Sequence, residues 1–79
     1  MAVSFGFGEL KKGMKARVSD VTGSAPETVR LIELGLTPGT EFTVTKIAPL
    51  GDPIEISLRG YRLCLRKKES AEILLESVD

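Results

Sequence analysis

The stretch "IEISLRGYRLCLRK", residues 54–67, decides the fold of this chain. Apolar residues alternate with polar ones on both sides of Gly60, and a period of two is typical of a β-strand with one buried face. A glycine between two such runs predicts a tight turn. We therefore expect a β-hairpin with one face turned to the core and the other to solvent.

The register of this hairpin depends on which residues form its turn. If Gly60 and Tyr61 form a two-residue loop, Gly60 supplies the positive φ that a type II′ turn needs. Leu58 then faces Leu63 on the inner side. A shift of the register by one residue would scatter the apolar side chains over both faces, so we expect the two-residue loop.

In this register the outer face of the hairpin carries two facing pairs of charged residues. Glu55 lies opposite Arg66, a contact worth roughly 0.2–1 kcal/mol. Arg59 lies opposite Arg62, where two like charges repel each other. Either both guanidinium groups splay into water, or an acidic group in the chain or on a partner lies over them. Residues 59–68 hold five basic residues and no acidic one, which adds weight to a partner.

One short helix is expected in "SAPETVRLIELGL", residues 24–36. Ser24 and Glu27 have the spacing of a capping box, and Pro26 suits the first helical turn. Gly35 stands where a left-handed C-terminal cap is needed. The helix should therefore end just before Gly35.

The remaining segments predict short strands and irregular connections. We expect a strand within residues 14–21, which bulges or ends at Asp20 and Val21, and a second strand within residues 40–49, in which Ile47 points inward only if a bulge falls near Lys46. A helical turn is expected within 67–73 and a last strand at 73–78. Such strands with one inserted helix can close into a small, strongly bent β-barrel, which removes exposed sheet edges. The predicted fold is mainly β, with residues 1–9 as a loose N-terminal arm and 10–79 as a single domain. Phe5 or Phe7 could attach the arm to the core.

The composition argues against several classes of protein. The chain has 79 residues, no histidine, one cysteine (Cys64) and a formal net charge of zero. A zinc site built from cysteine and histidine, an internal disulfide and an imidazole base are therefore excluded within one chain. Zero net charge argues against general nucleic-acid binding. Without an apolar run long enough for export or membrane insertion, we expect a cytoplasmic protein that is not an enzyme and has no cofactor.

Two longer stretches resemble a known family. "RLIELGLTPGTEFTV" at residues 30–44 and "APLGDPIEISLRGYRLCLRKKESAEI" at 48–73 closely resemble the FeoA family of small cytoplasmic proteins of bacterial ferrous iron uptake. The resemblance implies an SH3-like barrel with an inserted helix. It also implies a partner, FeoB, a membrane protein with a cytoplasmic GTPase domain. The chain departs from the family by keeping only Arg30 before "LIELGL", where members often carry two or three arginines.

The resemblance implies a non-enzymatic module that binds FeoB on the cytoplasmic side. The contact residues that we expect are four on the hairpin and three apolar anchors: Arg59, Tyr61, Arg62, Arg66, Leu34, Leu36 and Leu50. An exposed apolar strip on the helix could also lead to self-association. Two other functions remain open: a regulatory domain like the C-terminal domain of iron-dependent repressors, and a small-barrel nucleic-acid binder.

Metal binding by this chain is not expected, even within an iron-transport family. Fe(II) prefers imidazole and carboxylate ligands, and the chain offers only carboxylates and one thiol. The carboxylates are expected to be solvated surface charges: Glu27, Glu33, Glu69, Glu72 and Glu76. Cys64 points to the outer face and is expected to be an inert thiol.

Overall fold

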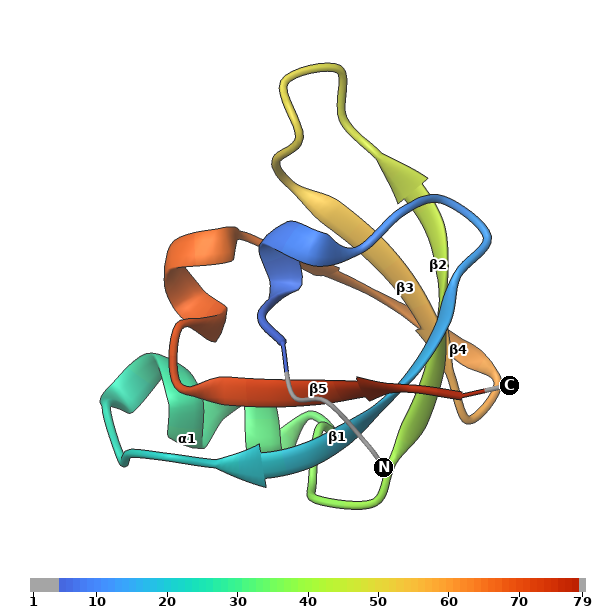
Figure 1. The fold of residues 1–79 in the computed structure, drawn as a ribbon. Helices are drawn as coiled ribbons and strands as arrows, with labels where there is room; N and C mark the ends of the chain where they lie inside the picture. Colours follow the sequence, from blue (N-terminus) through green and yellow to red (C-terminus); the bar gives the residue numbers. More distant parts are fainter. Residues whose placement is uncertain (1–4, 79) are drawn as a thin grey trace.

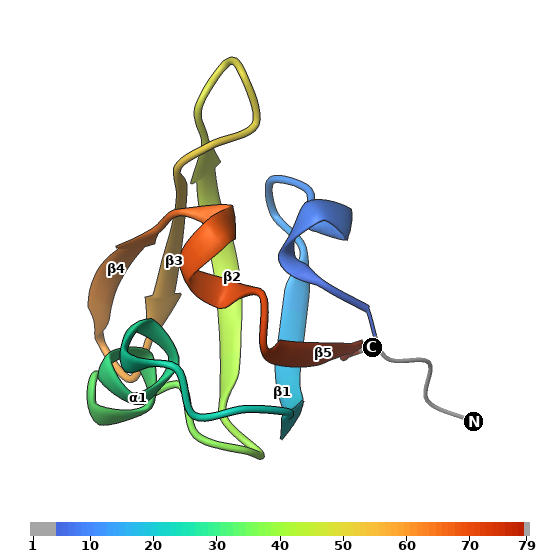
Figure 2. The same ribbon diagram turned by 90° about the vertical axis from the view of Figure 1, so that its left-hand side faces the viewer.

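The computed structural model describes residues 5–78, which form one curved antiparallel sheet with an α-helix and two short 3-10 helices packed beside it (Figures 1 and 2). The strand order is β4-β3-β2-β1-β5. The elements in chain order are η1 (Phe7–Glu9), β1 (Lys15–Val21), α1 (Pro26–Glu33), β2 (Glu41–Ile47), β3 (Ile54–Leu58), β4 (Tyr61–Leu65), η2 (Lys67–Ser70) and β5 (Ile73–Ser77). The mainly β fold with one inserted helix and a C-terminal helical turn is therefore confirmed.

Alternate residues of the strands build the core. On β2 and β3, for example, Phe42, Val44, Ile54 and Ile56 are at most 2% exposed, while the residues between them are at least partly accessible. Register shifts between Val18 and Asp20 and between Val44 and Lys46 show one bulge in β1, where the sequence left a bulge or the strand's end open, and one in β2 near Lys46. They bend the strands so that one short sheet can wrap its own core.

The described part of the N-terminal arm packs against the domain. Phe7 is 3% exposed and stacks on Phe42, with ring centroids 5.9 Å apart. Phe5 forms an antiparallel bridge with Leu75 of β5. Residues 1–4 of the predicted arm lie outside the described residues. Phe5 and Phe7 thus attach residues 5–9 to the core, as the sequence allowed, and burial of a phenylalanine contributes about 1.5–3 kcal/mol.

Helix α1 ends as predicted but begins differently. Leu36 N–H donates to Leu31 O and Gly35 N–H to Ile32 O, each at 3.0 Å, which is the Schellman pattern with Gly35 at φ 120°. At the other end the N-cap residue is Ala25, and no side chain of the helix itself caps it. The predicted capping box of Ser24 and Glu27 is therefore wrong.

The β3–β4 hairpin differs from the predicted register by two residues. Leu58 pairs with Tyr61, so Arg59 and Gly60 are the loop residues. Their φ angles are 50° and 86°, as a type I′ turn requires. The predicted loop of Gly60 and Tyr61 is therefore wrong. A shift of the register by two residues keeps every side chain on its own face of the sheet. The apolar pattern therefore fits both registers equally well.

Between residues 5 and 78, no helix is long and apolar enough to cross a membrane.

Candidate interaction surfaces

The two arginines at the hairpin tip do not face each other. Arg62 lies opposite Ser57, and Arg59 is in the turn itself. The guanidinium Nη2 of Arg59 donates a hydrogen bond to Thr40 Oγ1 at 3.2 Å, which connects the turn to the loop before β2. Likewise Glu55 lies opposite Cys64 rather than Arg66. No acidic group is needed to separate two facing arginines here.

The outer face of β4 nevertheless remains strongly basic. Alternation along the strand puts the side chains of Arg62 and Cys64 on the outer face, and Arg66 follows directly after β4; all three are exposed. We call Arg62 and Arg66 the β4 arginines. Since β4 ends the strand order, one side of it pairs with no neighbouring strand. Among residues 5–78 no ion pair involves Arg59, Arg62 or Arg66.

Tyr61 and Leu34 meet between the hairpin and the end of helix α1. The hydroxyl of Tyr61 donates a hydrogen bond to the carbonyl oxygen of Leu34. Tyr61 is 41% exposed, and Leu34 is half-buried against the core. Gly35 also lies against this hydroxyl, since a Cβ on it would collide with the Tyr61 oxygen. These residues offer a partner some surface, but they also hold α1 to the hairpin.

Leu36 is not available as an apolar anchor. Its side chain is fully buried, at 0% exposure. The expectation of an exposed Leu36 is wrong because this residue follows the glycine of the Schellman motif. In that position the chain turns back and a side chain commonly packs on the last helical turn, here near Leu31. Leu31 itself is 2% exposed.

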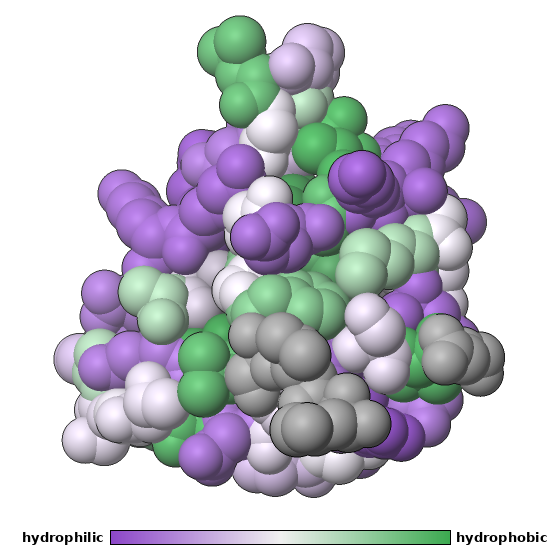
Figure 3. Space-filling model, viewed as in Figure 1, coloured by the Kyte–Doolittle hydropathy of each residue, from purple (hydrophilic) through white to green (hydrophobic). Residues whose placement is uncertain are grey.

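Leu50 is the most exposed large apolar residue that the structure describes, at 96%. It lies in the loop between β2 and β3, which projects from the body of the molecule (Figures 1 and 2). In the space-filling view this projection carries hydrophobic surface (Figure 3). The five residues of β3, about 17 Å of strand, separate this loop from the turn at Arg59. The expected contact residues therefore lie at two ends of the hairpin.

A hollow of about 400 Å³ lies at the base of the projecting loop. Five of its eight lining residues are apolar or a thiol and three are charged: Ile47, Ala48, Pro49, Pro53, Cys64, Lys12, Lys46 and Glu55. The sequence analysis missed this hollow. The prolines on both sides of Leu50 were the only local indication, because Lys12 and Cys64 reach it from distant segments.

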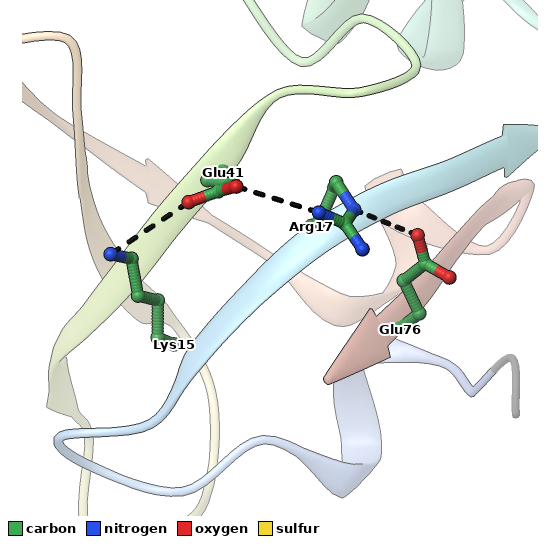
Figure 4. Close-up of polar contacts among 4 residues, drawn as sticks. All are labelled: Lys15, Arg17, Glu41 and Glu76. Atoms are coloured by element: carbon green, nitrogen blue, oxygen red, sulfur yellow. Dashed lines mark hydrogen bonds and ion pairs between the residues drawn. The ribbon is translucent and has the colours of Figure 1, made fainter. Parts of the chain in front are cut away.

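A row of ion pairs crosses the outer face of β2, β1 and β5 (Figure 4). Glu41 lies 3.7 Å from Lys15 Nζ and 3.5 Å from Arg17 Nη1, and Arg17 Nε donates to Glu76 Oε1 at 2.8 Å. The Glu76 hydrogen bond and charge raise the pKa of Arg17 above its usual value. The side chain of Glu76 is only 18% exposed, so the expectation of a solvated carboxylate is wrong at this position.

Glu72 also has a structural role. Its Oε1 accepts hydrogen bonds from the Thr28 hydroxyl at 2.6 Å and the Ala25 N–H at 3.1 Å. These bonds lower the pKa of the Glu72 carboxyl, and the hydroxyl has the larger effect. Within the described part of the chain, no three acidic, cysteine or histidine side chains gather where they could hold a metal ion.

Comparison with protein families and curated proteins gives a consistent result. Residues 7–77 match the FeoA domain family. A Fe(2+) transport protein A/Fe(2+) transporter FeoB fusion protein of Porphyromonas gingivalis (strain ATCC BAA-308 / W83) is 33% identical over 70 residues. The match covers 89% of this chain but only 8% of that protein.

Solved structures share the fold. A FeoA-like protein from Clostridium acetobutylicum is 34% identical with a TM-score of 0.88, covering 100% of this chain and 92% of that one. FeoA of Stenotrophomonas maltophilia, solved in complex with zinc and described as an SH3 domain protein, is 25% identical with a TM-score of 0.73, covering 95% and 88%. The SH3-like architecture expected from the sequence is thereby confirmed.

A further solved structure has this architecture. IdeR of T. acidophilum matches with a TM-score of 0.79 over 98% of this chain and 35% of that one. At 18% identity the likeness shows a common fold alone.

Proposed function

This chain belongs to the FeoA family, and on that premise we propose that it is a non-enzymatic accessory protein of ferrous iron uptake that acts by binding the transporter FeoB. The observation that carries the proposal is the relative in which the same domain and FeoB share one polypeptide. A covalent link gives two modules an effective concentration in the millimolar range. Separate chains need a surface that replaces this link.

The β4 arginines and Arg59 support such a surface. They are exposed and form no ion pair with any described residue. Unpaired cations on a rigid strand steer an acidic partner into contact and accelerate association. Tyr61 and Leu34 lie beside the turn that carries Arg59 and would add contact area at its margin.

An accessory role on the cytoplasmic side requires no chemistry from this chain. The sequence has no histidine, so it lacks the imidazole that most often serves as a general acid or base. A binding protein changes its partner only if it binds one conformation more tightly than another. We therefore assign to the chain a preference for one state of FeoB.

Co-purification of FeoB from solubilised membranes with the tagged chain tests this proposal. The variant Arg62→Glu/Arg66→Glu should lose FeoB while its thermal unfolding stays unchanged, since both side chains are exposed. The matched control Arg62→Lys/Arg66→Lys keeps the positive charges and should retain FeoB. Failure of the wild-type chain to retain FeoB would overturn the proposal.

A further inference from the structure

The loop between β2 and β3 presents Leu50 on a hydrogen-bonded turn. Ala48 N–H donates to Pro53 O at 3.1 Å, and Gly51 N–H donates to Ala48 O at 2.7 Å. Asp52 Oδ1 accepts from Lys67 N–H at 3.0 Å, which fixes the loop to η2. A backbone already fixed by hydrogen bonds loses little freedom on binding, so that only the Leu50 side chain has to become ordered.

The hollow beside this loop is suited to a side chain of a partner. Its volume of about 400 Å³ lies near the lower end of the usual range for ligand pockets, about 300–1,000 Å³. Lys12, Lys46 and Glu55 are the charged residues of its lining. The Glu55 carboxylate accepts a hydrogen bond from Thr45 Oγ1 at 2.7 Å, and neither lysine forms an ion pair with a described residue. The two unpaired lysines therefore favour acidic groups on the occupant.

We propose that Leu50 and this hollow form a second contact surface for FeoB, which we call the loop-end surface. It takes a segment whose apolar side chain enters the hollow and whose carboxylates face Lys12 and Lys46. Leu50 inserts into the partner in return. This inference rests on the proposed function, and it adds a site at the end of the hairpin away from Arg59.

A protein segment fits this surface better than a lipid bilayer does. Even a myristoyl chain, with many more methylene groups than one leucine, gives only marginal membrane binding. A concave, mainly apolar hollow with charges of both signs in its lining is also a feature of protein and peptide sites. The loop-end surface combines one protruding and one concave feature, as complementary protein interfaces do.

Cys64 provides a direct probe of the hollow. It is exposed, it lines the hollow, and it is the only cysteine of the chain. The experiment measures its rate of maleimide labelling by mass spectrometry of this chain, alone and in complex with the cytoplasmic part of FeoB. Occupation of the hollow should slow the labelling at least about tenfold in the wild-type complex and clearly less in a saturated complex of Leu50→Ser, which keeps the β4 arginines on either side of Cys64.

Substitution of Leu50 tests the other half of the surface. Leu50→Ser should weaken binding of FeoB by about tenfold or more, as loss of a buried anchor does. The matched control is Val29→Ser on α1, an exposed apolar residue outside the surface (42% exposed), which should leave binding within about twofold. Thermal unfolding of both variants checks that the fold is intact.

Several results would overturn the inference while leaving the proposed function in place. In each, the wild-type chain binds FeoB. Equal binding by Leu50→Ser with unchanged labelling of Cys64 would be one such result. A second would be loss of a dimer of this chain, or of binding to anionic vesicles, in Leu50→Ser while FeoB binding is unchanged. Absence of FeoB binding by the wild-type chain would instead overturn both.

Discussion

The hydroxyl of Thr28 donates a hydrogen bond of 2.6 Å to the carboxylate of Glu72. Thr28 is in the first turn of α1 and is 2% exposed, whereas Glu72 lies just before β5. The same carboxylate oxygen accepts the Ala25 N–H, one of the backbone donors that have no partner within the helix. Glu72 therefore caps α1 from a distant part of the chain.

The Glu72 contact should make the stability of the protein depend on pH. Hydrogen bonds to the ionised form lower its folded-state pKa below the usual 4.5. The stabilisation is therefore complete above pH 4.5 and is lost as the pH falls through the folded-state pKa. Urea unfolding should show that Glu72→Gln is less stable than the wild-type protein at pH 7, with a smaller difference near pH 3. An equal difference at both pH values would contradict this assignment.

Leu36 and Leu50 should respond to alanine substitution in opposite ways. Leu36 is 0% exposed, so Leu36→Ala should lower the free energy of unfolding by about 2–5 kcal/mol through lost burial and a cavity. Leu50 is 96% exposed, and Leu50→Ala should change the free energy of unfolding by no more than about 0.5 kcal/mol. Chemical denaturation of the two variants measures both values. Similar losses in both would mean that the β2–β3 loop packs on the body.

The turn register predicts an unusual preference at position 59. Arg59 has φ 50°, a left-handed conformation that asparagine tolerates better than other residues with a side chain. Arg59→Asn and Arg59→Ala both lose the bond to Thr40, so their difference reports the backbone alone. Arg59→Asn should be more stable by about 0.5–1 kcal/mol. If alanine were equal or better, residue 59 would lie in a strand and the turn would start later.

The bond between the hairpin and α1 can be tested at Tyr61. Tyr61→Phe removes the hydroxyl that donates to the Leu34 carbonyl and leaves the ring in place. The free energy of unfolding should fall by about 0.5–1.5 kcal/mol, the net value of one hydrogen bond. Equilibrium unfolding in urea provides the measurement. Unchanged stability would show that water replaces the hydroxyl at no cost.

Alternating apolar residues in the strands and local turn and helix-end signals predict most of the fold from the sequence. The buried face of the strands, both bulges and the end of α1 at Gly35 all follow from patterns within a few residues. The hairpin register does not, because registers that differ by two residues place the same side chains inside. The choice of turn depends on the backbone at Arg59, which the apolar pattern does not report.

Long-range contacts account for the other differences. The cap of α1 is Glu72, which lies 47 positions from Ala25. The sequence near the helix start shows only the capping-box spacing of Ser24 and Glu27. Leu36 follows a predicted C-terminal glycine and could have been assigned to the core from that position alone. The sequence predicts Leu50 as a contact residue, and the structure adds the hollow beside it. Whether it contacts FeoB stays a prediction.

The most direct test of the account is a calorimetric titration of the purified chain with the cytoplasmic part of its FeoB, in dilute buffer and in about 1 M salt. At the higher salt the Debye length shrinks to about 3 Å, which screens the exposed β4 arginines. We expect saturable binding in dilute buffer that weakens by about tenfold or more in high salt. An absence of binding in both conditions would contradict the account.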